Sequence, residues 1–259
     1  MTAYLLDRKV AHGPKWYTSR RQPILAICVH VTAGLEDLDS TNDQSAEKTA
    51  AYAATTDRKV SWHQGTDTDT NLVLLPDGYT AFHVAGYNSC TLGREISKRH
   101  TDWRTMPAKW VQATLGNAAP ADAEWCRTHN IPARKATRRE LDAAIAQWQR
   151  TGDVAPVGFI SHSELDPARR SDPGFVRSVD TFPWHSYLEL VRHHLNGTKP
   201  KEIDVQPNVL VVLTYNACLG RNPSMQEIAA GVNAIDAIGQ LAYVESIANS
   251  DEAELHRAA

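Results

Sequence analysis

A run of seven residues, 25–31, restricts the possible folds more than any other part of the sequence. Its sequence is Leu-Ala-Ile-Cys-Val-His-Val, which has the length of a β-strand. It lacks the alternation of polar and apolar residues that a half-exposed strand shows. The run is therefore predicted to form a strand that is buried on both faces, with Gly34 opening the loop that follows.

Strand and helix patterns alternate over the rest of residues 25–195. Further strands are predicted at 60–63, 71–75, 91–97 and 157–161, and helices at 44–55, 107–129, 137–148 and 184–195. Pro120 is expected to kink or divide the second helix. Thr137 and Glu140 have the spacing of a capping box at the start of the third. This order predicts an α/β fold in which a mixed β-sheet is flanked by helices.

The segment 196–200, Asn-Gly-Thr-Lys-Pro, interrupts this pattern and is the predicted boundary between a domain at 1–199 and a small all-α module at 200–259. Ser224 and Glu227 form a second capping-box pattern in the module, and Ile235, Ile238, Leu241 and Val244 fall near helical spacing. Residues 195–259 hold four Lys/Arg and eight Asp/Glu, a net charge of −4, whereas the rest of the chain is near +1. This difference in charge supports a division of the chain into two structural units.

Composition excludes several classes of protein. With 42% hydrophobic and 22% charged residues the chain is typical of a soluble globular protein, and its net charge of −3 argues against general nucleic-acid binding. No run approaches the roughly 18 apolar residues of a membrane-spanning helix, so no stable membrane association is expected. Charged residues scattered through the first 25 positions leave no signal-peptide core. The four cysteines lie far apart in the sequence, at Cys28, Cys90, Cys126 and Cys218. This spacing argues against a disulfide framework and favours folding in a reducing cytosol.

Three side chains at or beyond the ends of predicted strands suggest a metal site: His30, His162 and Asp172. Two imidazoles and a carboxylate, with a fourth position left to water, form the ligand set of a catalytic zinc site. Zinc suits nitrogen ligands and hydrolysis without redox chemistry. Taken singly, each residue also has a structural explanation, since a strand-end histidine is more often only hydrogen-bonded and Asp172 could cap the Asp-Pro-Gly turn.

Four blocks of residues follow one another over positions 23–195. They are Val29-His-Val-Thr-Ala-Gly34, then Lys59-Val-Ser-Trp-His63 with Phe82-His-Val-Ala-Gly86, then Leu92-Gly-Arg-Glu-Ile96, and finally Ser161-His-Ser-Glu-Leu-Asp-Pro-Ala-Arg-Arg-Ser-Asp-Pro-Gly174. In this order they resemble the zinc-dependent N-acetylmuramoyl-L-alanine amidases, the type-2 amidase family that includes phage lysozyme-amidases, bacterial anhydro-muropeptide amidases and peptidoglycan-recognition proteins. The last block is the most specific.

The resemblance implies a mixed sheet flanked by helices, zinc on His30, His162 and Asp172, and cleavage of the amide bond between N-acetylmuramic acid and L-alanine in peptidoglycan. Glu95 matches the glutamate that moves the proton in the anhydro-muropeptide branch. Arg170 matches the family's lysine near the developing oxyanion, and as arginine it keeps the charge but does not donate the proton.

Both assignments have alternatives. Glu95 could be an exposed charge at a strand end. Arg170 could pair on the surface with Glu164 or Asp166.

The sequence also departs from the family pattern. Val31 replaces a second histidine, and Trp62 stands where phage relatives have a catalytic tyrosine. Tryptophan does no acid–base chemistry, so Trp62 is expected to pack or to stack on substrate. Thr32 and His83 are expected to contact substrate, whereas His63 is either structural or part of the groove.

The expected function is therefore that of a peptidoglycan amidase, a phage endolysin or tail lysin made in the host cytoplasm without a signal peptide and acting on the cell wall. The alternatives are a non-catalytic peptidoglycan-binding protein and a cytosolic amidase that recycles muropeptides. In the C-terminal module, residues 215–223 resemble a small helical domain of unknown function from bacterial surface and secreted proteins. The module is expected to target the cell wall, to pack on the amidase domain or to mediate self-association.

Overall fold

The computed structural model describes residues 15–32, 43–98, 102–197 and 221–238, together with residues 211, 214, 215, 218, 219, 247 and 250. The chain divides into two compact units, Met1–Pro200 and Lys201–Ala259. Within the described residues, no helix has the length and apolar character needed to cross a membrane.

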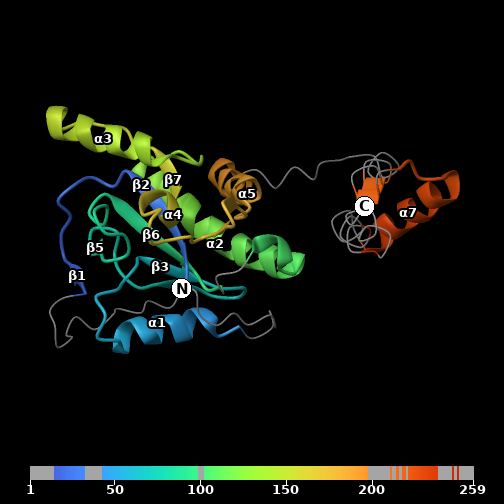
Figure 1. Ribbon diagram of the computed structural model, residues 1–259, viewed down its shortest axis with the longest axis horizontal. Coiled ribbons are helices and arrows are strands. Elements are labelled where there is room, and N and C mark those ends of the chain that lie inside the picture. The colour runs from blue at the N-terminus through green and yellow to red at the C-terminus, as the bar shows by residue number, and fades with distance from the viewer. Residues whose placement is uncertain are drawn as a thin grey trace. The chain divides into compact units, whose positions relative to one another are not determined.

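The first unit is built on a five-stranded sheet with the strand order β4-β3-β6-β2-β7 (Figure 1). Strands β2 (Ala26–Val31), β6 (Thr91–Ile96) and β7 (Gly158–Ser161) are parallel, β3 (Gln64–Thr66) is parallel to β6, and β4 (Asn71–Val73) is antiparallel to β3. The flanking helices are α1 (Ser45–Thr55), α2 (Ala108–His129), α3 (Arg138–Thr151) and α5 (Trp184–Asn196). The predicted fold class, a mixed sheet flanked by helices, is confirmed.

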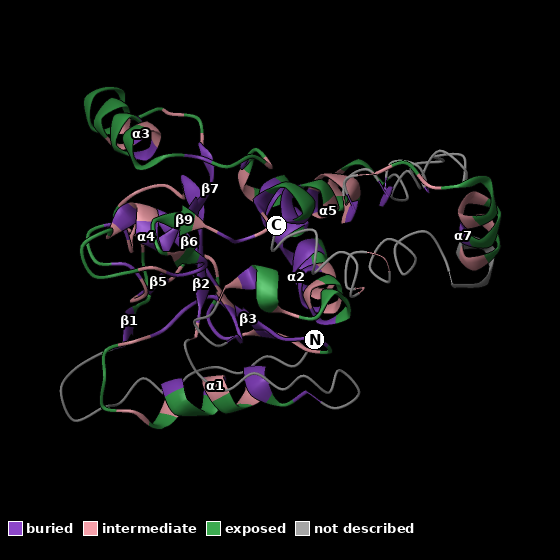
Figure 2. Cartoon of the chain, turned by 45° about the vertical axis from the view of Figure 1, so that its right-hand side comes forward, coloured by how far each residue is buried: buried purple, intermediate pink, exposed green. Residues whose placement is uncertain are grey.

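Strand β2 is buried on both faces, as its sequence predicts (Figure 2). Ile27 and Val29 point into a core shared with α2 and α5, whereas Ala26 and Cys28 point into a second core shared with α3. Side chains alternate between the two faces of a strand, so His30 lies on the same face as Ala26 and Cys28. This alternation decides which side of the sheet carries the histidine.

A third core joins α1 to the edge of the sheet formed by β3 and β4. Just before the two-residue strand β1 (Trp16–Tyr17), Lys15 donates from Nζ to the carbonyl oxygens of Ala53 at 2.5 Å and Ala54 at 3.0 Å, near the C-terminus of α1. A cation at that end of a helix interacts favourably with its exposed carbonyl groups. Strand β1 then pairs with β5 (Thr80–Ala81).

Most predicted elements are confirmed, but the strand expected at 60–63 is wrong. The strand begins only at Gln64, directly after the predicted segment, because residues 60–63 form a loop. Two hydrogen bonds from Ser61 hold this loop in place. Its backbone N–H donates to the carbonyl of Phe82, and its hydroxyl donates to the carbonyl of Lys15. The apolar signal at Val60 and Trp62 comes from packing of that loop against the third core.

Pro120 does not divide α2, which runs without a break from Ala108 to His129. Its buried neighbours Ala118, Ala119 and Ala123 lie in the core shared with α5, and this packing supports the helix on both sides of the missing N–H group. The capping box at Thr137 and Glu140 is confirmed. Short elements that the sequence does not signal are η1 (Trp103–Thr105), α4 (His162–Leu165), β8 (Phe175–Val176) and β9 (Val179–Asp180).

The second unit has its own small core and a helix, α7 (Met225–Ile238). The predicted capping box at its start is confirmed, because Glu227 N–H donates to Ser224 Oγ at 3.2 Å and Ser224 N–H donates to the Glu227 carboxylate at 2.7 Å. Leu219 is buried in this core and Ile228 packs against it. The predicted apolar positions 241 and 244 lie outside the described residues.

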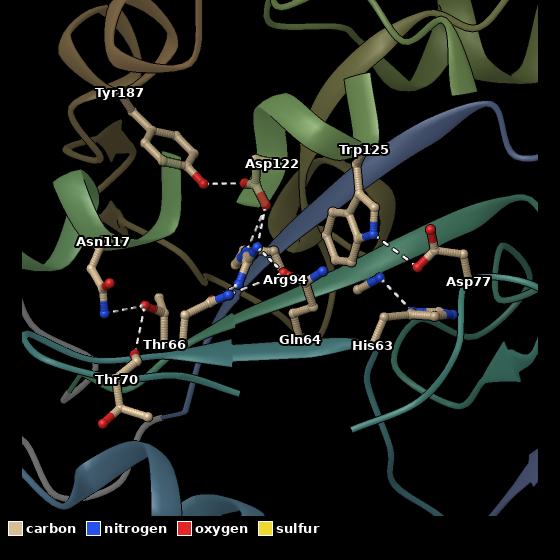
Figure 3. A network of polar contacts seen from close by, with 12 residues as sticks. His63, Gln64, Thr66, Thr70, Asp77, Arg94, Asn117, Asp122, Trp125 and Tyr187 are labelled. Atoms are coloured by element: carbon tan, nitrogen blue, oxygen red, sulfur yellow. Dashed lines mark hydrogen bonds and ion pairs between the residues drawn. The ribbon is translucent and has the colours of Figure 1, made fainter. Parts of the chain in front are cut away.

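A buried polar network joins the sheet to α2 and α5 (Figure 3). Arg94 on β6 donates from Nε to Asp122 Oδ1 at 2.8 Å, and both side chains are fully buried. The same guanidinium donates to Asn71 Oδ1 at 2.6 Å and to Gln64 Oε1 at 2.5 Å. Tyr187 on α5 donates its hydroxyl to the other carboxylate oxygen of Asp122. The network therefore places Arg94 on the face of β6 opposite to Glu95.

We expect Asp122→Asn to lower the free energy of unfolding by about 3–5 kcal/mol, because it leaves the buried Arg94 without a counter-charge. Urea denaturation of the full chain measures this change. The control is Glu124→Gln on the same helix, whose exposed ion pair with Arg127 contributes about 0–1 kcal/mol. Equal stabilities of the two variants would contradict a supporting role for the buried pair.

Candidate functional site

The candidate site lies where three parallel strands end. His30 near the end of β2 is the register partner of Glu95 on β6, so the two side chains share one face of the sheet. His162 follows β7 directly and begins α4. The loop after α4 brings Asp172 back to the two histidines. The carboxyl ends of parallel strands are where α/β proteins place their ligands.

The three predicted metal ligands converge on one point. His30 Nδ1 lies 2.9 Å from His162 Nδ1 and 3.3 Å from Asp172 Oδ2, and His162 Nδ1 lies 3.0 Å from the same oxygen. A tetrahedral zinc ion with bonds of about 2.0–2.1 Å places its ligand atoms about 3.3 Å apart. These three atoms, called the ligand triangle below, therefore form a group that could hold one metal ion.

A chain of hydrogen bonds orients the ring of His30. The hydroxyl of Thr91 donates to the carbonyl of Tyr87 at 2.8 Å, so its oxygen accepts from Nε2 of His83 at 3.2 Å. His83 Nδ1 then carries a lone pair and accepts from Nε2–H of His30 at 2.9 Å. His30 is left with a bare Nδ1, and this lone pair faces the other two atoms of the ligand triangle. Metal-binding histidines are typically held in this way through their second nitrogen.

The electrostatic environment favours the protonation states that bind a metal. Burial, and next the neighbouring His162, lower the pKa of His30 to about 4. Burial alone would raise the pKa of Asp172, but the adjacent imidazole rings of His162 and His30 outweigh it and hold that pKa below its usual range. A neutral imidazole and an ionised carboxylate are therefore present at neutral pH, as metal binding requires.

A second group of potential ligands, Cys28 with His30 and His83, is less suitable. Burial raises the pKa of the Cys28 thiol well above its usual range, and the carboxylates of Asp172 and Glu95 add to this effect. Only the thiolate binds metals, so the protonated thiol is a poor ligand. The hydrogen bond between His30 and His83 also occupies one nitrogen of each ring.

His83 is held firmly against the sheet. Its ring packs on Gly93 of β6 so closely that a Cβ atom at that position would lie 2.9 Å from His83 Cγ. The side-chain oxygen of Asn88 accepts hydrogen bonds from the backbone N–H groups of His83 and Val84 at 2.9 and 2.7 Å. His83 lines the cavity, as a substrate-contacting residue would, but its described contact to the ligand triangle is through His30.

We expect His83→Leu to weaken zinc binding about 10–100-fold, because His30 loses the acceptor that orients its ring. His83→Asn is the matched variant, since its amide oxygen replaces the acceptor at the Nδ1 position, and it should retain most of the affinity. Competition with a chromophoric chelator measures both affinities. Unchanged zinc affinity in His83→Leu would show that the hydrogen bond does not orient the ligand.

The ligand triangle opens into a cavity of about 520 Å³ that Glu95 and Arg170 also line. Burial raises the pKa of Glu95 well above its usual range, the Asp172 carboxylate adds to the rise, and Arg170 opposes it. Glu95 is therefore a half-buried group in the site rather than an exposed charge at a strand end. Of the two surface partners considered for Arg170, Asp166 pairs with Arg169 at 2.9 Å, and Glu164 accepts from the backbone N–H of Arg138 at 3.1 Å.

The remaining predicted residues also line this cavity. Trp62 is only 4% exposed, packs in the third core, and its indole Nε1 has no hydrogen-bond partner within the described residues. The hydroxyl of Thr32 lies 3.3 Å from the carbonyl oxygen of Lys98. Both residues appear in the lining, together with the metal-ligand candidates and His83.

His63 lies outside the lining and has a structural position. Its Nδ1 accepts from the backbone N–H of Gly93 at 2.9 Å, and Nε2 faces the carbonyl of Tyr79 at 3.1 Å and Nη2 of Arg20 at 2.6 Å. Burial, followed by the charge of Arg20, lowers the pKa of His63 to about 3. Of the two interpretations of His63, structural residue or part of the groove, these contacts favour the first: His63 is a buried, uncharged histidine.

Several cavity residues were not predicted from the sequence. Among them are basic and polar residues, which include Tyr52, Arg58, Lys59, Asn88 and Arg169. Lys59 is the first residue of the second family-like block, Arg58 directly precedes it, and Arg169 lies within the last block. Their positions within or next to the family-like blocks are the sequence signal that could have identified them as cavity residues.

No family model matches the sequence, and no curated protein matches it. Among solved structures, the chain is similar to a mutant endolysin from Bacillus subtilis with a TM-score of 0.44 and 18% identity, over 74% of this chain and 99% of that one. It is similar to the Staphylococcus aureus hydrolase AmiA, solved in complex with its ligand, with a TM-score of 0.47 and 17% identity over 75% and 83% of the two chains.

A third similar structure is the endolysin and N-acetylmuramoyl-L-alanine amidase LysCS from Clostridium intestinale, with a TM-score of 0.41 and 12% identity over 76% of this chain and 97% of that one. Two of these three proteins are thus named as endolysins, and one of them also as an N-acetylmuramoyl-L-alanine amidase.

Proposed function

We propose that the chain is a peptidoglycan hydrolase that uses one zinc ion to cleave the amide bond between N-acetylmuramic acid and L-alanine. The observation that carries this proposal is the ligand triangle of His30, His162 and Asp172, in which a bare imidazole nitrogen faces an ionised carboxylate. Three protein ligands beside an open cavity match a catalytic rather than a structural zinc site. The donor set of two nitrogens and one oxygen suits zinc and hydrolysis.

When bound, zinc supplies Lewis-acid chemistry, which polarises a carbonyl group and makes a water molecule acidic near neutral pH. Glu95 accepts the proton of the attacking water and delivers it to the amine that leaves with L-alanine. Arg170 donates hydrogen bonds to the amide oxygen as negative charge develops there. His83 holds His30 in place.

The lining of the cavity supports peptidoglycan as the substrate. Arg58, Lys59 and Arg169 line it together with Arg170, whereas its acidic lining residues are Glu95 and Asp172. A stem peptide carries carboxylates, and such a basic lining attracts them. Trp62 and Thr32 add one apolar and one hydroxyl surface for the muramoyl part.

Digestion of purified peptidoglycan followed by mass analysis tests the proposal. Free stem peptides with an intact N-terminal L-alanine are expected, without new reducing sugar ends. Treatment with a chelator should stop their release, and added Zn²⁺ should restore it. New reducing ends would identify a glycosidase instead. Binding to the wall without any release would identify a non-catalytic peptidoglycan-binding protein.

We further propose that the enzyme is a phage endolysin or tail lysin, made in the host cytoplasm and acting at the cell wall after its release. The chain has a second compact unit in addition to the hydrolase unit, and a further binding unit suits an enzyme that acts on a polymeric substrate. The rival is a cytosolic amidase that recycles small muropeptides. Comparing rates on intact wall and on soluble anhydro-muropeptides separates the two, since a lysin should cleave the wall at a rate comparable to that of soluble fragments.

The proposed role of residues 200–259 is to hold the hydrolase unit on the wall. A chain that ends at Gly197 keeps every proposed catalytic residue, so we expect normal zinc content and a rate on soluble muropeptides within about two-fold of the full chain. Its rate on intact wall should fall about ten-fold or more, because tethering raises the effective substrate concentration. Aggregation of the truncated chain would indicate packing of the two units instead.

A further inference from the structure

A second hollow of about 410 Å³ adjoins the cavity of the candidate site and is called the accessory hollow below. Residues 17–19 and Arg21 form one wall, and residues from 80 to 89 form the other. Phe82 and Asn88 line both the accessory hollow and the main cavity, so the two spaces are neighbours. A long substrate bound at the ligand triangle can therefore extend into the accessory hollow.

Specific contacts hold the two walls together. Arg20 donates from Nη1 to the carbonyl oxygens of Ser89 at 3.1 Å and Thr91 at 3.0 Å, and from Nε to that of Asp77 at 2.5 Å. Ser89 Oγ donates to the Gln22 side chain at 2.6 Å. Strand β1 pairs with β5 in register, with Tyr17 opposite Thr80. A binding surface fixed in advance loses less conformational entropy when it binds.

The lining has the chemistry of a sugar site. Tyr17 is 49% exposed, and its ring meets Phe82 edge to face at 5.1 Å, so one aromatic surface is presented to solvent. Residues with hydroxyl and amide side chains, at positions 18, 19, 80, 88 and 89, also line the hollow, with Arg21 as the charged member. A pyranose ring offers one apolar face of C–H groups with hydroxyl and acetamido groups at its edge, and this surface complements it.

We propose that the accessory hollow binds an N-acetylhexosamine unit of the glycan strand that continues from the muramic acid at the ligand triangle. This inference rests on the proposed function. Residues 15–22 build one wall of the hollow and lie outside positions 23–195, which carry the family resemblance. One wall of the site therefore lies outside the shared sequence blocks, whereas Phe82 and Gly86 of the other wall belong to them.

Binding of the tetramer of β-1,4-linked N-acetylglucosamine to the full chain tests the proposal, because this probe has no lactyl group and no peptide and is not cleaved by an amidase. We expect saturable binding by isothermal calorimetry and about ten-fold weaker binding in Tyr17→Ala. Tyr17→Phe keeps the ring and should bind like the unsubstituted chain. The control is Phe175→Ala, which removes an aromatic side chain of similar exposure, 43%, that lines neither space.

The outcomes separate this inference from the proposed function. Amidase activity without tetramer binding, or with equal binding by the unsubstituted chain and Tyr17→Ala, would overturn the sugar site and leave the enzyme intact. Binding that depends on Tyr17 in a chain without amidase activity would support the sugar site and overturn the proposed function. Tyr17-dependent binding of a free stem peptide in place of the tetramer would assign the hollow to the peptide arm and overturn the proposal.

Discussion

Replacing any one of His30, His162 and Asp172 by alanine is expected to remove the metal and the activity together. Each residue contributes one atom to the ligand triangle, and three protein ligands leave none to spare. Zinc content should fall from about one ion per chain to nearly none after dialysis. The amidase rate should fall by more than about 10³-fold, since the metal supplies several kcal/mol of transition-state stabilisation.

Two further variants make this result specific. Asp172→Cys offers a thiolate in place of the carboxylate, which is also a zinc ligand, so we expect it to recover zinc where Asp172→Ala does not. His185→Ala removes an exposed histidine from α5 and should change neither metal content nor rate. Metal analysis by atomic emission and release of free peptides from the wall are the two measurements. Full zinc and full rate in any of the three alanine variants would show that the ligand set is wrong.

The positions of the metal ligands could be predicted because local patterns determine them. The apolar run at 25–31 indicates a buried strand, and its alternation places His30 on one face near the end of that strand. The segment before His162 has the same character, and α4 begins where the strand ends. Parallel strands that end at one edge then bring both histidines together, which is a property of the fold class.

Other parts of the site depend on contacts that no local pattern records. The pairing of Glu95 with His30 requires the register between β6 and β2, which the strands alone do not reveal. The role of His83 requires both the small volume of Gly93 beneath its ring and the hydroxyl of Thr91 behind it. Arg20 binds carbonyl oxygens 57 to 71 residues away in the chain. Its segment has almost no periodic signal, so the accessory hollow was not predicted.

The loop at 60–63 shows why a short apolar pattern predicts poorly. Val60 and Trp62 alternate with polar residues as in a strand, but they pack against the core while the backbone forms a loop. A side chain buried from a loop and one buried from a strand give the same pattern over four residues. Longer helices do not have this ambiguity, and α2 was predicted to within one residue even though it contains Pro120.

Glu95→Gln is expected to keep the fold and the zinc and to lower the amidase rate by roughly 10²–10⁴-fold, the usual contribution of a general acid–base group. The substitution is nearly isosteric and leaves the ligand triangle untouched. Burial raises the pKa of Glu95 well above its usual range, so the carboxylate that accepts a proton forms only as the pH rises through that higher value. The rate of the unsubstituted enzyme should therefore rise with pH at a higher pH than an ordinary glutamate would give.

The pH profile distinguishes proton transfer from a merely structural effect. Glu95→Gln should lose the increase of the amidase rate with pH that ionisation of Glu95 causes. Glu189→Gln changes an exposed residue of α5 and should keep both this increase and the full rate. Release of free L-alanine amino groups, measured across a pH series at equal zinc content, gives the comparison. A Glu95→Gln enzyme with a normal rate and an unchanged profile would move proton transfer to another group. His83, which also lines the cavity, would then be the next residue to substitute.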